Sequence, residues 1–235
     1  HTTGRYTGSS ETQIEADLNR LRDLQTGDAD AFCGLLDRTV RDTFSNDYWT
    51  ITLPNRLDTT AAKSPPLSAY WASLNLLEAE VLFSELKVSS MLDPVVTPIK
   101  DMERHHLFPR KYLERQGVDN RKAVNAVANM AFMDWPENIK VSDSAPGEYW
   151  PELASGMPAA QLKNQQYWHA LPVGWEQLGF EEFKAKRRAL IANVIRDGFE
   201  KLSGGQAPEN ETGNLAELLQ GETQTVEYKS SGRIN

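Results

Sequence analysis

The sequence predicts a mostly helical α+β fold with a few short strands. The chain has 235 residues, which is long enough to bury a substantial hydrophobic core. Hydrophobic residues make up 40% of it, and six of the residues are tryptophan, which argues against general disorder. Apolar side chains recur at helical spacing in several segments, whereas the apolar run at 130–133 is short and suits a strand.

Composition and charge exclude several classes of protein. The 33 acidic residues outnumber the 25 basic ones, which gives a net charge of −8 and argues against a binder of polyanions that works by bulk charge. The lone cysteine, Cys33, excludes an internal disulfide framework and a zinc site built from several cysteines. No apolar run approaches the roughly 20 residues that span a bilayer, and no signal peptide is visible, so we expect a cytoplasmic protein that binds no membrane.

The N-terminal third is expected to be helical with one irregular stretch. A first helix is predicted over 11–26, and a second is predicted to begin at Asp28 or Asp30 and to bury Cys33 in its apolar stripe. Residues 46–63 suggest an irregular segment or a short strand. Ser64, followed by two prolines, is typical of a helix start, and that helix is expected to continue to Leu82.

The rest of the chain alternates short elements with loops. A turn or two of helix is expected from Lys111 to Arg115, a helix capped by Asp119 over 120–128, a strand at 130–133 and a short helix from Pro136. Residues 145–151 and 156–158 suggest loops because of their prolines and glycines. A long helix is predicted over 181–202, ended by Gly204 and Gly205, and a polar linker follows over 206–213.

The motifs of several enzyme classes are missing. The sequence contains no GxxxxGK[ST] phosphate loop, no HExxH, no CxxC and no GxSxG. The sequence therefore gives no support for nucleotide hydrolysis, zincin proteolysis or α/β-hydrolase chemistry.

Two adjacent histidines, followed by two spaced asparagines, are the pattern that suggests chemistry. His105 and His106 lie in a proline-flanked segment, Asn129 follows in the apolar run, and Asn138 comes nine positions later. From the histidine pair alone, a surface pair with one packed member is the more ordinary interpretation. The order His-His, Asn, Asn is that of an HNH nuclease finger, a β-hairpin and a helix around one divalent metal.

The segment Glu103-Arg104-His105-His106-Leu107-Phe108-Pro109 resembles the HNH domain of the GmrSD-type modification-dependent restriction endonucleases. The resemblance continues in 125–129, 138–142 and 145–149, and more weakly over about 5–202. It implies a ββα-metal (HNH) finger carried by a helical domain, and a larger NTP-dependent domain in the same protein or in a partner. The segment 221–231 is similar to the first strand of an AlbA-like or Schlafen-like nucleic-acid-binding module.

The resemblance also implies roles for individual residues. His106 would be the general base, for which a neutral imidazole is suited near pH 7. His105 and Asn138 would be the metal ligands, and Asn129 would support the site by hydrogen bonding across the loop. The expected ion is Mg²⁺, with Mn²⁺ or Ni²⁺ as alternatives, because His105 stands where many relatives carry an acidic residue and imidazole suits those transition metals.

Other residues carry open alternatives. Arg104 and Lys140 are possible phosphate contacts, and Lys140 is equally well explained as a solvated lysine. Glu103 could be a further ligand or could face away, and His169 is better explained as a packed core histidine. Residues 100–122 carry seven basic against four acidic side chains, and the last long helix adds a second basic cluster, so the two could form a surface that follows phosphates. Four tryptophans are expected in the core: Trp135, Trp150, Trp168 and Trp175.

The expected organisation has four parts: a helical segment at 1–92, the HNH finger at 93–155, a helical cap at 156–205, and a linker with the beginning of a further module at 206–235. The activity that the resemblance implies is metal-dependent cleavage or nicking of phage DNA by a bacterial anti-phage restriction protein. Two alternatives stay open: a non-catalytic helical interaction module, and an RNase or toxin nuclease with the same finger. The sequence leaves the oligomeric state open.

Overall fold

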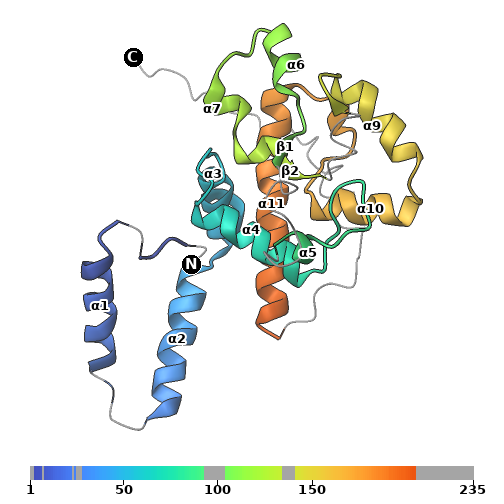
Figure 1. Ribbon diagram of the computed structural model, residues 1–235. Coiled ribbons are helices and arrows are strands. Elements are labelled where there is room, and N and C mark those ends of the chain that lie inside the picture. The colour runs from blue at the N-terminus through green and yellow to red at the C-terminus, as the bar shows by residue number, and fades with distance from the viewer. Residues whose placement is uncertain are drawn as a thin grey trace, which may run out of the picture.

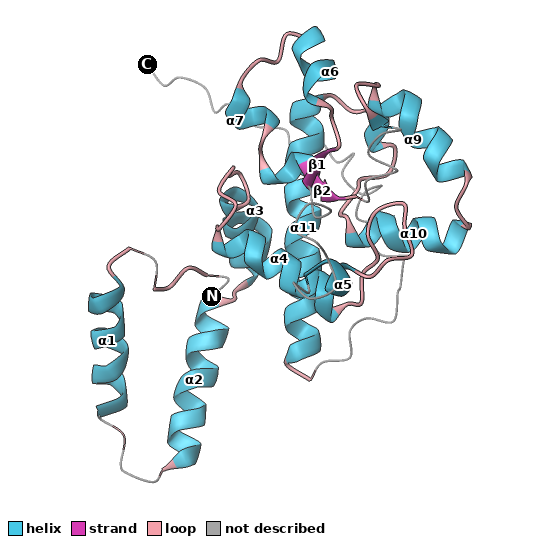
Figure 2. Ribbon diagram, viewed as in Figure 1, coloured by secondary structure: helices cyan, strands magenta, loops and turns pink. Residues whose placement is uncertain are grey.

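The computed structural model describes residues 3–6, 8–22, 24, 28–92, 104–133 and 141–204. Within these ranges the chain is mostly helical with a single small sheet, as the sequence predicts (Figure 2). The expected short helix from Pro136 and everything expected beyond Gly204 lie outside the described residues. Among the described helices, none is long and apolar enough to cross a membrane.

The first two helices form an antiparallel pair that stands away from the rest of the molecule (Figure 1). They are α1 (Ser10–Arg22) and α2 (Ala29–Thr43), and the Asp28 carboxylate accepts the Ala31 N–H at the start of α2, as expected of a cap. Neither helix contains a buried residue. Cys33 is exposed, so the prediction that it is buried was wrong: the apolar stripe is present, but no other described element covers it.

Residues 46–63 are helical in their first half, which corrects the expected irregular or strand-like segment. A π-helix, η1 (Tyr48–Thr52), continues into α3 (Leu53–Arg56). Tyr48 and Trp49 each contact Phe44, and the Phe44 and Trp49 rings also contact Phe199 of the last helix. This aromatic cluster outweighs the local preference of the threonines and Ile51 for a strand.

The helix that begins after Ser64 is shorter than expected. It is α4 (Pro65–Leu76), and the chain then turns through Glu78, which has a positive φ, into two isolated bridges. One bridge joins Glu80 to Lys87, and the other joins Leu82 to Met133. The helix α5 (Val88–Leu92) follows.

The last helix, α11 (Phe180–Leu202), matches the expected 181–202 and runs through the centre of the molecule (Figure 1). It packs against α4, α3, η1 and α10. Gly198 permits the close approach of α4, because a Cβ there would lie 2.5 Å from the Ser73 Oγ. Gly204 follows the helix with a φ of 76°, as expected of a helix end.

Two hydrophobic cores lie along α11. The first combines η1, α3 and α4 with the second half of α11, and the second combines the sheet region with α9 and the first half of α11. The second core therefore draws on residues from both 93–155 and 156–205.

The remaining elements are β1 (Arg104–His106), α6 (Arg110–Arg115), α7 (Arg121–Val124), η2 (Val127–Asn129), β2 (Met130–Phe132), α9 (Pro146–Ser155), α10 (Ala159–Trp168) and η3 (Trp175–Gln177).

Two of these elements, α7 and α9, correct the sequence expectations. The α7 cap is Asn120, whose Oδ1 accepts the Lys122 N–H, in place of Asp119, and the helix ends at Val124. Residues 145–151, expected to be a loop, begin α9: Pro146 occupies the first turn, where a missing N–H costs nothing, and Pro151 is tolerated inside the helix. The prolines were therefore misleading as loop signals.

Candidate functional site

A two-stranded antiparallel sheet holds the histidine pair. In its register Arg104 pairs with Phe132, His105 with Ala131 and His106 with Met130. The two histidines are neighbours at the end of β1. Neighbouring side chains point to opposite faces within a strand, but at a strand end both can reach one small site. His105 is buried, whereas His106 is half-buried, and only His106 is accessible enough to meet a substrate directly.

His106 has a defined hydrogen-bond partner. Its Nε2 lies 3.0 Å from Oδ1 of Asn125, which is the first residue after α7. An amide oxygen can only accept, so Nε2 carries the proton and Nδ1 is left with its lone pair. Burial lowers the pKa of His106 below its ordinary value, the Asn125 hydrogen bond opposes that shift, and the positive charge of Arg110 adds to it. A neutral ring with a free Nδ1 is the form that can accept a proton.

Asn129 is fully buried and ties the segment after β1 to the loop before β2. Its Oδ1 accepts the Phe108 N–H at 2.9 Å, and its Nδ2 donates to the carbonyl oxygens of Phe108 and Val124 at 3.1 and 2.9 Å. Its own carbonyl oxygen accepts the Leu107 N–H at 2.9 Å. These contacts match the hydrogen bonding across the loop that was expected of Asn129, and they fix the backbone that follows His106.

Two residues that the sequence did not single out for this purpose brace the same region. Tyr149 of α9 donates its hydroxyl to the Leu107 carbonyl oxygen at 2.6 Å. Arg187 of α11 is fully buried and donates from Nη1 to the Ala128 carbonyl oxygen at 2.9 Å and from Nε to that of His169 at 3.1 Å. No sequence signal separates Arg187 from the basic residues around it, because its burial depends on α11 lying in the centre of the molecule.

The basic cluster of α11 does not form the phosphate-following surface that the sequence suggested. Arg187 is buried, and its three basic neighbours on α11 are paired with carboxylates. The pairs are Lys184 with Glu181 at 2.9 Å, Lys186 with Glu182 at 3.0 Å and Arg188 with Asp58 at 2.7 Å. The charges of α11 thus stabilise the helix and its packing, and they leave little free positive charge for a nucleic acid.

Four of the candidate residues lie wholly or partly outside what the structure describes. Asn138, Lys140 and Glu103 lie outside the described residues, and of Arg104 only the backbone is described. The described ranges hold no group of three or more His, Cys, Asp or Glu side chains suited to a metal. Of the two expected ligands, His105 alone is described, and an imidazole there suits Mn²⁺ or Ni²⁺ better than Mg²⁺.

His169 is a packed histidine, as expected. It is almost completely buried, and its Nε2 lies 2.8 Å from the Glu80 carbonyl oxygen. Burial lowers the pKa of His169 to about 4, the hydrogen bond to Glu80 opposes this shift, and the nearby Arg187 charge adds to it. Trp150 and Trp175 are buried in the second core and Trp168 packs against the first, also as expected, whereas Trp135 lies outside the described residues.

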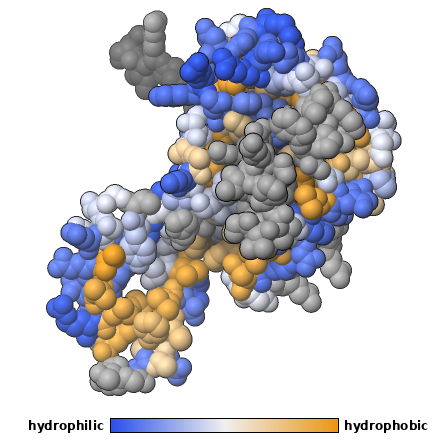
Figure 3. All heavy atoms as spheres, viewed as in Figure 1, coloured by the Kyte–Doolittle hydropathy of each residue, from blue (hydrophilic) through white to orange (hydrophobic). Residues whose placement is uncertain are grey.

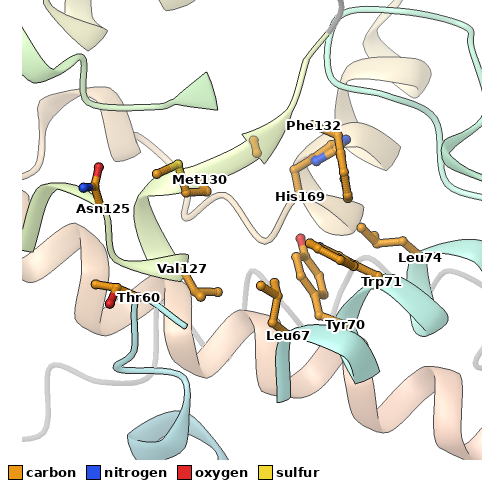
Figure 4. A pocket seen from close by; sticks show the side chains of 11 residues that line it. Thr60, Leu67, Tyr70, Trp71, Leu74, Asn125, Val127, Met130, Phe132 and His169 are labelled. Carbon is orange, nitrogen blue, oxygen red and sulfur yellow. The ribbon is translucent and has the colours of Figure 1, made fainter. Parts of the chain in front are cut away.

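A narrow apolar cavity lies between Asn125, which holds His106, and the buried His169. Figure 4 shows Asn125 at one end of it and His169 towards the other, with Tyr70 and Trp71 of α4 along one wall. Its volume is about 20 Å³, which is enough for a single water molecule. The cavity is therefore a gap in the packing between α4 and β2, and it is too small for an organic ligand.

The chain was also compared with known proteins. It matches no family model, no curated protein and no solved structure. The functional argument therefore rests on the residues and on their geometry.

Proposed function

We propose that the chain is a metal-dependent HNH endonuclease domain that cuts or nicks DNA. The observation that carries the proposal is the arrangement of His106 on a two-stranded sheet, with its Nε2 held by Asn125 and its following backbone held by Asn129. A general base needs a neutral ring, a fixed tautomer and access to solvent, and His106 combines these three properties.

In this proposal each residue has a separate task. His106 takes the proton of the attacking water on Nδ1, while Asn125 keeps Nε2 protonated and the ring oriented. Asn129 is a positioning residue that holds the strand end on which His106 stands. His105 and Asn138 would hold a divalent ion, Mg²⁺, Mn²⁺ or Ni²⁺, which when bound supplies a Lewis acid for the scissile phosphate and the leaving oxygen.

The biological setting of the proposal rests on the resemblance alone. It places the domain in a cytoplasmic bacterial restriction protein that acts on phage DNA. An NTP-dependent domain, in the same protein or in a partner, would supply recognition and control. Arg104 and Lys140 would contact phosphates, and the regions 1–92, 93–155, 156–205 and 206–235 would keep the roles given above.

Nicking of supercoiled plasmid tests the proposal. Purified protein with Mg²⁺ or Mn²⁺ should convert supercoiled DNA to open circles, and EDTA should stop the conversion. His106→Ala should lower the rate about a hundredfold or more, because it removes the general base, with an unchanged melting temperature. His169→Gln is the matched control, since it changes a histidine remote from the proposed base. Equal rates for His106→Ala and the unaltered protein, in the chain joined to its NTP-dependent partner as well, would remove the nuclease from consideration.

The interaction-module alternative has one observation in its favour. The faces of α1 and α2 expose several large apolar side chains, which gather in one patch in Figure 3. Among them Leu18 is 56% and Phe32 42% exposed. Unchanged plasmid in the nicking assay would favour this alternative, and the same assay with RNA in place of DNA tests the RNase or toxin alternative.

A further inference from the structure

A second, larger pocket lies on the outer side of Asn125. It has a volume of about 170 Å³ and opens between α6 and α7. Asn125 lines it and also holds the ring of His106, so the pocket adjoins the proposed general base. Any group bound there would lie on the Asn125 side of the His106 ring.

The walls of this pocket carry charges of both signs. Arg110 and Arg121 face Glu114 and Asp119, which makes the formal charge of the lining zero. Arg110 is already engaged, since its Nε donates to the Glu114 Oε1 at 2.8 Å. Such a lining does not favour a phosphate, because the carboxylates would repel the anion as strongly as the guanidinium groups attract it.

The same lining suits a neutral molecule that has both donors and acceptors. Glu114 and Asp119 can accept hydrogen bonds from an amino group, and Arg121 can donate to a carbonyl oxygen or to a ring nitrogen. Val118 and Val124 provide apolar surface for the faces of a flat ring. The size agrees with this interpretation, because an apolar cavity of about 150 Å³ accommodates benzene.

We propose that this pocket receives one amino-bearing nucleobase of the DNA strand, adenine, cytosine or guanine, next to the phosphodiester that is cut. Thymine is disfavoured because it offers no exocyclic amino group to the two carboxylates. A base reaches such a pocket only by leaving the stack, so single strands and mismatched duplexes are better ligands than paired DNA. This inference rests on the proposed nuclease function and assigns its site a preference among bases.

Binding of short oligonucleotides, measured by fluorescence anisotropy in EDTA so that no strand is cut, tests the pocket separately from cleavage. The full chain is titrated with oligo-dA, oligo-dC and oligo-dT of eight nucleotides, and with duplexes of the same sequences. We expect oligo-dA and oligo-dC to bind about tenfold more tightly than oligo-dT, which is the discrimination that one base-specific contact gives.

Two neighbouring residues of α7 provide matched variants. Arg121 lines the pocket, whereas the adjacent Lys122 is exposed and does not line it, and replacing either by alanine removes one positive charge. Arg121→Ala should reduce the preference over oligo-dT, because only a base that occupies the pocket loses a contact with Arg121. Lys122→Ala should weaken binding of all three oligonucleotides by the same small factor, as the loss of a phosphate contact does. Asp119→Asn should also reduce the preference, even though the loss of a negative charge by itself favours binding of DNA.

The outcomes separate the pocket from the nuclease. Equal affinity for the three oligonucleotides, or equal effects of Arg121→Ala and Lys122→Ala, would overturn the base pocket even if the plasmid is nicked. A preference that depends on Arg121, in a protein that does not nick plasmid even when it is joined to its NTP-dependent partner, would support the base pocket and overturn the nuclease.

Discussion

His106 and His169 occupy two different environments, although each ring presents Nε2 to an oxygen acceptor. His106 is half-buried and bonded to a side-chain amide at 3.0 Å, whereas His169 is buried and bonded to a backbone carbonyl at 2.8 Å. Burial lowers the pKa of both, to about 4 for His169. A lowered pKa therefore does not by itself identify a catalytic histidine: access to solvent and a neighbouring pocket distinguish His106.

The largest expected effect concerns the loop beside His106. Asn129→Ala leaves the Phe108 N–H and the Phe108 and Val124 carbonyl oxygens without their buried partner, so it should lower the free energy of unfolding by about 3 kcal/mol. Thermal unfolding should show a fall of about 10 °C, and nicking should be lost at temperatures where the variant is folded. An unchanged nicking rate in the folded variant would show that the loop does not position His106.

The pH dependence of stability should identify His169. Its pKa is about 4 in the folded chain and near its ordinary 6.5 in the unfolded chain, so the unfolded chain binds the extra proton between these values. Stability should therefore fall as the pH drops below about 6.5, by about 2 kcal/mol at pH 5. His169→Gln should flatten the melting temperature measured between pH 7.5 and 5. His106→Ala is the comparison variant, because the lowered pKa of His106 also makes stability fall as the pH drops. An unaltered pH dependence of the melting temperature in His169→Gln would contradict the assignment to His169.

Arg187 connects the two regions, because it donates to the carbonyl oxygens of Ala128 and His169. Arg187→Lys keeps the charge but cannot serve both acceptors, so we expect a loss of about 2 kcal/mol in denaturant unfolding. Arg188→Lys, at the partly exposed Asp58 pair, should cost less than about 1 kcal/mol. Equal losses in the two variants would show that the buried connection is unimportant.

The smallest expected effect is at Asn125, which is exposed and contributes little to the core. Asn125→Ala frees the His106 ring to take the other tautomer, so kcat for nicking should fall about tenfold, which is a part of what a general base contributes, with an unchanged melting temperature. Asn120→Ala, which removes the α7 cap, should do the reverse and lower stability more than kcat. A change in KM alone for Asn125→Ala would contradict its role in orienting the ring.

A second contrast, between the N-terminal helix pair and α11, shows what the spacing of apolar residues predicts and what it does not. Both regions have apolar side chains at helical spacing, and in both the predicted helices are present. In α11 the apolar side is buried between two cores, whereas in α1 and α2 no residue is buried and Cys33 is exposed. The spacing of apolar residues determines the local helical conformation, but burial depends on which other elements pack against the apolar face of the helix.

The candidate site was predictable to a similar extent. The strand at 130–133, the histidine pair and the hydrogen-bonding role of Asn129 could be inferred from the order of the residues, because short-range patterns and the side-chain chemistry carry that information. Asn125 belongs to the segment 125–129 of the family resemblance, but the sequence assigned it no role. Its contact with His106 joins residues 19 apart, and no local pattern reports such a distance.

The sequence by itself determined the helical class, the limits of α6 and α11 to within one residue, the short strand expected at 130–133 and the local preference of each segment. Only the tertiary structure decided that residues 48–56 are helical, that Arg187 is buried and that a pocket of mixed charge adjoins His106. The physical reason is that backbone preferences act within a few residues, whereas aromatic packing, desolvation of a charge and the shape of a pocket depend on segments brought together from far along the chain.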